Sequence, residues 1–330
     1  MAVSAVLGCG RSLPPRVVTS EELGSELGLG GKVVAERSGV VRRHYAEAGI
    51  GPSDLGREAA LAALADAGLG PGDLDLIIFA TMTPDMAFPG SACFLQDKLG
   101  CDTIGALDLR AQCAGFLFAL AAADRFVRAG RARCVLVVGA EIHSAALDQS
   151  PRGAAATPYF GDGGGAVILG AAAEPGVLAT VLHGDPSGLE RFWCEFPASR
   201  HYPARMELAQ FEAGAHFYVL DAEAVHPQAE RALAEVTREA LGRAGVAAES
   251  VALFVAHYFD HRVARRALEK LGIRGDRIVA TAEAAGHVAA AGIPIALADA
   301  VAAGRVRRGD LVCCAAFGAG FSWAGAVIRL

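Results

Sequence analysis

A cysteine at the start of an apolar helix is the first candidate for chemistry in this sequence. Cys113 follows a strand-like run, residues 104–109, and precedes a fully apolar stretch from Ala114 to Ala123. The N-terminus of a helix favours an anion, because its backbone N–H groups are unpaired and the helix dipole is positive there. We therefore expect the Cys113 thiol to ionise readily, and Gly115 leaves space for an acyl group beside the sulfur. Position alone equally allows a buried core cysteine.

The sequence repeats itself, and the repeat predicts how the chain is organised. Residues 57–80, REAALAALADAGLGPGDLDLIIFA, are echoed by residues 237–256, TREALGRAGVAAESVALFVA. The stretches 100–130 and 272–304 are nearly equal in length and are followed by CVLVVG and LVCCAAFG, respectively. This pattern indicates a duplicated βαβαβ unit. We expect two mixed sheets, with helices between them and outside them.

Two histidines occupy positions that the repeat makes equivalent to sites in the first half. His257 ends the strand-like run LFVAH, the counterpart of LIIFA, and His287 precedes the counterpart of the Cys113 helix. Ligands bind where strand ends and helix starts meet in α/β folds. Either histidine alone would more often be structural, but a cysteine and two histidines at matched places predict a catalytic centre.

Composition narrows the class of protein. The chain has 330 residues, of which 53% are hydrophobic and 20% charged, which indicates two domains or one large duplicated one. A net charge of −6 argues against nucleic acid or an anionic membrane as the main ligand. No apolar run is long enough to span a membrane, and we interpret the opening MAVSAVLGC as a β-strand rather than a lipoprotein signal.

The spacing of the cysteines indicates a reducing compartment and argues against a metal site. Eight cysteines occur without a CxxC pair or a Cys/His metal spacing, so we expect a reducing, cytoplasmic location and no metal.

Other segments give local expectations. We expect helices at residues 20–27, 53–68 and 91–99, and strands at residues 3–7, 73–80 and 133–139. The glycine-rich run FGDGGGAVILG, residues 160–170, leads into a strand and lacks a following Lys-Ser/Thr, which favours a tight turn over a phosphate loop. The segment around residues 183–216 has no repeat counterpart, and we interpret it as an insertion over the site.

Five motifs taken together resemble one family along nearly the whole chain. They are ERSGV, AFPGSACFLQDKLG, CAGFLFAL, FGDGGGAV and GAGFSWAGAVIRL. The sequence is similar to thiolase-fold condensing enzymes of the β-ketoacyl-acyl carrier protein synthase III type. This resemblance implies an α/β thiolase fold with duplicated βαβαβ halves in a five-layer αβαβα arrangement. The halves would be residues 1–172, with the nucleophile, and residues 173–330, with the two histidines.

The resemblance also implies roles for the candidate residues. Cys113 matches the family's nucleophile and His257 its first histidine, whereas His287 stands where the family has an asparagine. Backbone N–H groups of Cys113 and Ala319 would form the oxyanion hole. His257 and His287 would hold the thioester carbonyl of a malonyl unit while carbon dioxide leaves, which makes a Cys-His-His condensing enzyme for polyketide or fatty-acid-like specialised metabolism.

Replacement of the asparagine keeps two alternatives open. Relatives that lack it can act as non-decarboxylating acyltransferases, in which a histidine deprotonates a hydroxyl, amine or thiol acceptor. A catalytically silent partner subunit is the third reading, and the intact Cys113 and histidines count against it. We also expect acyl loading to survive every substitution of His287, with Cys113 activated mainly by the helix terminus and His257.

Further positions bear on substrate delivery. Arg37 and Arg152 match residues that contact the coenzyme A nucleotide in the family, but Val33 replaces a stacking tryptophan and Ala215 an asparagine. These losses favour donors carried on acyl carrier protein over coenzyme A. Arg262 matches a carrier-docking arginine, and further positive surface would come from Arg42, Arg43, Arg265 and Arg266.

The family also implies an assembly and a set of small-molecule ligands. We expect a homodimer in which the strand near Leu107 pairs across the dyad and Phe88 lies near the partner's acyl pocket. Acyl thioesters are the expected substrates, and no cofactor is expected.

Overall fold

Two five-stranded sheets with the same strand order form the frame of the molecule. The structure is a computed structural model that describes residues 3–330. The first sheet runs β1 (Val3–Ser12), β7 (Gly163–Ala172), β6 (Cys134–Glu141), β4 (Leu76–Ala80) and β5 (Gly105–Leu109). The second runs β8 (Val177–Gly184), β14 (Ser322–Arg329), β13 (Leu311–Gly318), β11 (Leu253–His257) and β12 (Ile278–Ala280). Strand directions also match. In the first sheet β4 is parallel to β5 and β6, and in the second sheet β11 is parallel to β12 and β13. The predicted duplication is confirmed.

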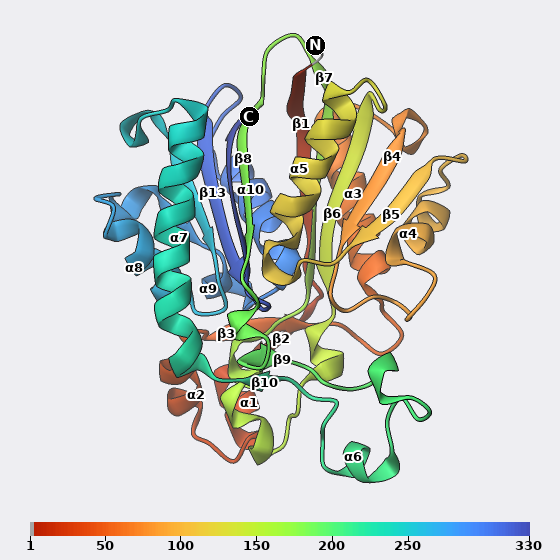
Figure 1. Cartoon of the computed structure of the whole chain (residues 1–330), viewed down its shortest axis with the longest axis vertical. Helices are drawn as coiled ribbons and strands as arrows, with labels where there is room; N and C mark the ends of the chain where they lie inside the picture. Colours follow the sequence, from red (N-terminus) through yellow and green to blue (C-terminus); the bar gives the residue numbers. More distant parts are fainter. Residues whose placement is uncertain (1–2) are drawn as a thin grey trace.

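Helices fill the space between the sheets and cover both outer faces (Figure 1). The central layer is α5 (Gly115–Arg128) and α10 (Gly292–Ala302), whose apolar side chains share one core with strands of both sheets. The first sheet is covered by α3 (Pro52–Ala67) and α4 (Ser91–Leu99), and the second by α7 (Ala222–Ala244) and α8 (His261–Glu269). The predicted five-layer αβαβα thiolase arrangement is therefore confirmed.

Local signals explain where several helices begin. The side chain of Thr19 accepts a hydrogen bond from the Glu22 N–H at 3.1 Å and so caps α1 (Ser20–Glu26). The Asp108 carboxylate accepts from the N–H groups of Ser91 and Ala92, at 2.7 and 2.8 Å, at the start of α4. Both elements match the sequence prediction closely.

The helix at Cys113 begins later than predicted. Cys113 lies in a 3-10 turn, η2 (Gln112–Ala114), and α5 starts at Gly115. The equivalent turn in the second half is η10 (Ala289–Ala291), directly before α10. Gln112 and Ala289 each open their turn with a positive φ, 45° and 36°, and they are the only non-glycine residues among residues 3–330 that do so. The duplication therefore extends to a strained backbone turn that reaches into the central layer.

A cap of smaller elements covers the end of the molecule opposite the two termini (Figure 1). It contains α1, α2 (Gly31–Ser38), β2 (Arg16–Thr19) and β3 (Arg42–Tyr45). The insertion predicted near residues 183–216 contains β9 (Phe192–Trp193) and α6 (Leu208–Glu212), and β10 (Val219–Leu220) follows it. A separate short helix, α9 (Ala282–Ala285), follows β12. The sequence did not predict α2 or the antiparallel pairing of β2 with β3. The run 160–170 turns into β7 as expected.

One predicted surface residue lies in the interior. Arg43 is fully buried, and its guanidinium donates to the Pro158 carbonyl at 2.9 Å and to the Ser20 hydroxyl at 3.2 Å. The expectation that Arg43 adds to a positive surface is wrong, because alternation along β3 points it inward while Arg42 points out. Within residues 3–330, none of the helices combines the length and hydropathy needed to cross a bilayer.

Candidate active site

Cys113 lies where the first half of the chain meets the end of β13. Its side chain is only 2% exposed. A Cβ atom on Gly318 would lie 2.9 Å from the Cys113 Cβ, so a glycine is needed at the last position of β13 for this approach. The backbone N–H groups of Ala319 and of Cys113 itself lower the pKa of the thiol and so favour its anion. These are the two groups that would form the oxyanion hole according to the family resemblance.

His257 is the last residue of β11, as predicted, and two contacts fix its ring. Its Nδ1 lies 2.5 Å from the hydroxyl oxygen of Thr281. A Cβ on Gly292, the first residue of α10, would lie 2.2 Å from the same nitrogen. The ring therefore packs against the bare backbone at the start of the central helix.

His287 is held by backbone hydrogen bonds to the glycine-rich run. The His287 N–H donates to the Tyr159 carbonyl at 2.7 Å, and the Gly161 N–H donates to the His287 carbonyl at 3.0 Å. A Cβ on Gly161 would lie 2.3 Å from the Ala285 carbonyl oxygen, so this close pairing requires a glycine. The run interpreted as a tight turn thus also positions His287.

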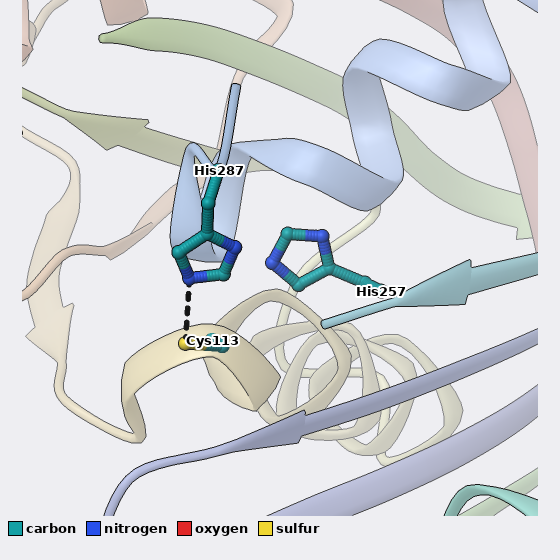
Figure 2. A group of neighbouring side chains, drawn as sticks. All are labelled: Cys113, His257 and His287. Carbon is teal, nitrogen blue, oxygen red and sulfur yellow. Dashed lines mark hydrogen bonds between the residues drawn. The ribbon is translucent and has the colours of Figure 1, made fainter. Parts of the chain in front are cut away.

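The three side chains converge on one point (Figure 2). The Cys113 Sγ lies 3.2 Å from His287 Nε2, and the rings of His257 and His287 stack with centroids 4.8 Å apart and planes 16° apart. One ligand atom from each of the three residues lies within 4.8 Å of the others. A sulfur and two imidazole nitrogens at these distances could also hold a zinc ion, and the absence of a metal stays a prediction.

The sulfur contact bears on how Cys113 is activated. The nitrogen that meets the sulfur belongs to His287 and not to His257, whereas activation mainly by the helix terminus and His257 stays a prediction.

Burial controls the charge state of the site. It raises the pKa of the Cys113 thiol to about 12, with a smaller contribution from the Glu141 carboxylate, against the opposing hydrogen bonds from Ala319 and Cys113. Burial lowers the pKa of His257 to about 3, and burial together with the neighbouring histidines holds the pKa of His287 well below its usual value. The expectation of a readily ionised free thiol is therefore wrong. The site holds a neutral thiol beside neutral imidazoles, and the proton must leave as the sulfur attacks.

The sequence reasoning missed residues that complete the site. His143 follows β6 in the turn η3 (His143–Ala146), is fully buried, and stacks on the His287 ring at 6.0 Å. Tyr218, two residues after the segment predicted as an insertion, lies 3.1 Å from His143 Nδ1 through its hydroxyl. Phe160 packs edge-on to His287 with a centroid distance of 5.2 Å. Phe192, from the predicted insertion, packs on Phe160 with centroids 5.9 Å apart, so the insertion reaches the site, but no motif marked His143.

The predicted binding residues divide into one group and one outlier. The Arg37 guanidinium donates to the Ala154 carbonyl at 3.0 Å, and Arg262 donates to the Arg37 carbonyl at 2.7 Å. Arg152 donates to the Ala213 carbonyl at 2.9 Å, two residues before Ala215. Arg262, at the start of α8, thus contacts Arg37 of the cap, and Arg152 contacts the segment that carries Ala215.

Phe88 is the outlier, because it lies in the loop before α4 and is 83% exposed. Arg262 is also bound by both oxygens of Asp260, at 2.9 and 2.6 Å, so most of its donors already have partners within the chain.

Comparison with known proteins identifies the family. A curated β-ketoacyl-[acyl-carrier-protein] synthase III from Rhodospirillum centenum is 39% identical over 332 residues, covering 99% of this chain and 98% of the relative. The chain belongs to the β-ketoacyl-acyl carrier protein synthase III family. Residues 107–186 match the family described as 3-oxoacyl-[acyl-carrier-protein (ACP)] synthase III, and residues 241–330 match its C-terminal region.

Solved structures of synthase III enzymes agree with this assignment. The crystal structure of 3-oxoacyl-[acyl-carrier-protein] synthase III from Aquifex aeolicus VF5 superposes with a TM-score of 0.89 at 32% identity, covering 99% of this chain and 100% of that one. The priming β-ketosynthase from the R1128 polyketide biosynthetic pathway has the same TM-score, 0.89, at 28% identity, covering 99% and 96% of the two chains.

Proposed function

We propose that this synthase III family member is a condensing acyltransferase that works through a Cys113 acyl-enzyme. Cys113 attacks the carbonyl of an acyl thioester while its proton moves to His287 Nε2, and the carrier thiol leaves with a proton. Hydrogen bonds from the Cys113 and Ala319 N–H groups stabilise the negative charge that develops on the carbonyl oxygen. The short contact between sulfur and imidazole supports this order of events, because the free thiol is neutral.

The second half-reaction joins two carbon chains. His257 and His287 donate N–H hydrogen bonds to the thioester carbonyl of a malonyl-type donor, which loses carbon dioxide and becomes an enolate. The enolate carbon attacks the Cys113 thioester, and the sulfur leaves. One observation carries this proposal: two neutral imidazoles stack 4.8 Å apart over the sulfur, and His257 Nε2 and His287 Nδ1 are buried without partners among residues 3–330.

Delivery by acyl carrier protein is the favoured route for the acyl group. Val33 is 42% exposed in α2 and offers no stacking surface for adenine, and Ala215 offers no side-chain hydrogen bond. The curated relatives are named β-ketoacyl-[acyl-carrier-protein] synthase III. We propose a role in polyketide or fatty-acid-like metabolism, which the R1128 priming ketosynthase supports by analogy. We further propose a cytoplasmic homodimer that needs no cofactor.

The Cys113 assignment is tested by intact-protein mass spectrometry with acyl thioesters on both carriers. Wild type and Cys93→Ala, which changes an exposed cysteine, should gain one acyl mass. Cys113→Ala should gain none. An adduct that survives on Cys113→Ala would exclude Cys113 as the nucleophile.

One observation favours a second candidate function. His287 Nε2 lies directly beside the sulfur, and an imidazole, unlike an asparagine, can take a proton. A non-decarboxylating transfer to a hydroxyl, amine or thiol acceptor would use His287 as the base. Acyl transfer to such an acceptor without release of carbon dioxide would establish this alternative.

A further inference from the structure

His143 is a buried polar side chain at the site to which the proposed reaction gives no role. His143 is 0% exposed, and its Nε2 has no hydrogen-bond partner among the described residues. A buried nitrogen without a partner is costly, because it has given up water and gained nothing in return. His257 and His287 also carry one unpaired nitrogen each, but the condensation uses both of theirs.

The position of His143 links it to the reacting sulfur. Its ring stacks on His287 with planes 20° apart and centroids 6.0 Å apart, and the His287 ring also stacks on His257. His287 in turn contacts the Cys113 sulfur at 3.2 Å. An acyl chain attached to Cys113 therefore starts beside His287, and His143 is the imidazole that stacks on His287.

The surroundings of His143 fix its ring. The Asp162 carboxylate accepts hydrogen bonds from the backbone of the η3 turn, including the Ser144 N–H at 2.9 Å. The Tyr218 hydroxyl lies 3.1 Å from His143 Nδ1, and Phe160 packs on the ring at 4.9 Å. A side chain held by its backbone, by Tyr218 and by an aromatic wall is suited to recognising a ligand.

The chemistry of the imidazole defines what it can recognise. Burial lowers the pKa of His143 to about 3, so the ring is neutral at physiological pH and carries one proton. If Tyr218 donates to Nδ1, then Nε2 is an N–H donor; if Nδ1 donates to Tyr218, then Nε2 is an acceptor. A hydroxyl group suits both tautomers, because it donates and accepts, whereas an oxo group only accepts and suits the tautomer in which Nε2 carries the proton.

We propose that His143, positioned by Tyr218, selects acyl groups that carry a hydroxyl or oxo group close to the thioester, by forming a hydrogen bond to that oxygen through Nε2. The inference rests on the proposed acyl-enzyme and adds the class of acyl group that the enzyme accepts. An unsubstituted alkyl chain would leave Nε2 unpaired and is disfavoured for that reason.

Small thioesters test this selection without the carrier. Wild type is incubated with N-acetylcysteamine thioesters of butyrate, 3-hydroxybutyrate, 4-hydroxybutyrate and 3-oxobutyrate, and the rate of acylation is followed by intact-protein mass spectrometry. At least one substituted chain should load about 10-fold or more faster than butyrate. His143→Leu should remove this preference or reverse it, and Tyr218→Phe should weaken it.

The ratio between substituted and plain chains separates selection from a structural role. A variant that merely disturbs His287 would slow all four probes equally and leave the ratio unchanged. His143→Gln, which keeps a donor and an acceptor, should retain part of the preference. Because Tyr218→Phe alters only a hydroxyl, it keeps the test decisive if His143→Leu does not fold.

Two failures are distinguishable. Loading of butyrate on Cys113 at least as fast as every substituted chain, or an unchanged ratio in both variants, would overturn the selection by His143 alone. Absence of any adduct on Cys113, with these probes and with carrier-bound donors, would overturn the proposed function itself.

Discussion

The contact between His287 and the Cys113 sulfur changes what a substitution of His287 should do. Burial leaves the thiol neutral, so attack needs an acceptor for its proton, and His287 Nε2 is 3.2 Å away. His287→Ala should therefore slow acyl loading by roughly 10²-fold. Single-turnover mass spectrometry at pH 7 measures this rate directly.

Thr281→Ala is the matched comparison for His287→Ala, since it loosens the neighbouring His257 ring without touching the sulfur contact. It should slow condensation more than loading. Loading at the wild-type rate in His287→Ala would contradict the role of His287 and restore His257 and the helix terminus as the activating groups.

The three buried histidines of the site make the stability of the fold depend on pH, and the sign of that dependence follows from their pKa shifts. The pKa values of His143 and His257 are lowered to about 3, and that of His287 is also lowered. The unfolded chain takes up protons near pH 6.5 that the folded protein cannot, so stability is present above pH 6.5 and is lost as pH falls toward 3. Each histidine can contribute up to about 1.4 kcal/mol per pH unit in this window.

Glu141 acts in the opposite direction. Burial raises its pKa to about 7, so its contribution is present below pH 4.5 and is lost as pH rises through 7. Between pH 6.5 and 4.5 three histidines outweigh one carboxyl, and the free energy of unfolding should fall. Urea titrations at several pH values should show a shallower fall for His143→Leu. An equal slope in that variant and in wild type would show that His143 is protonated in the folded state.

At the scale of elements, the start of α10 sets the position of His257. Gly292→Ala would place a methyl group 2.2 Å from His257 Nδ1, and the ring must move. We expect kcat/KM to fall by roughly 10²-fold, because small displacements of reacting groups are costly. Gly242→Ala is the control, since that glycine lies in α7 with open space at its Cβ, and stability there should rise by about 0.5–1 kcal/mol. Equal activity of the two variants would contradict the packing role of Gly292.

Elements with a strong repeat or a capping residue could be predicted from the sequence. The helices at Ser91–Leu99 and Ser20–Glu26 and the strand that ends at His257 follow from periodicity and caps. Helix α2 was missed because residues 31–38 contain two valines and no polar cap. His143 was missed because a single histidine after a strand gives no periodic signal, and its burial depends on packing against Tyr218, which follows the predicted insertion. The prediction that the Cys113 thiol ionises readily was wrong, because only the packed structure shows that the sulfur is buried away from water.

At the scale of the whole molecule, an open sheet edge favours a dimer. β5 lies at the end of its sheet and pairs only with β4 among residues 3–330, and Phe88 is 83% exposed in the loop between β4 and α4. Pairing of two β5 edges across a dyad would cover both features. Light scattering at micromolar concentration should give a dimer for wild type and more monomer for Leu107→Lys. A monomeric wild type would contradict the proposal.

Carrier recognition is also a property of the whole surface. If acyl carrier protein delivers the acyl group, Arg37→Glu should raise KM for carrier-bound donors and leave N-acetylcysteamine thioesters unaffected. Arg131→Glu is the control, because this exposed residue follows the far end of α5, about 20 Å from the site. Equal effects of the two substitutions, or equal kcat/KM for carrier and coenzyme A donors, would count against a docking surface in the cap.

Release of carbon dioxide is the most direct test of the condensing reaction. Wild type is first acylated on Cys113 with a substituted acyl thioester and then mixed with a malonyl donor labelled in its free carboxyl group. The account predicts one labelled carbon dioxide for each acyl group consumed, and a product longer than the acyl group by two carbons. Transfer of the acyl group to a hydroxyl, amine or thiol acceptor without labelled carbon dioxide would contradict it.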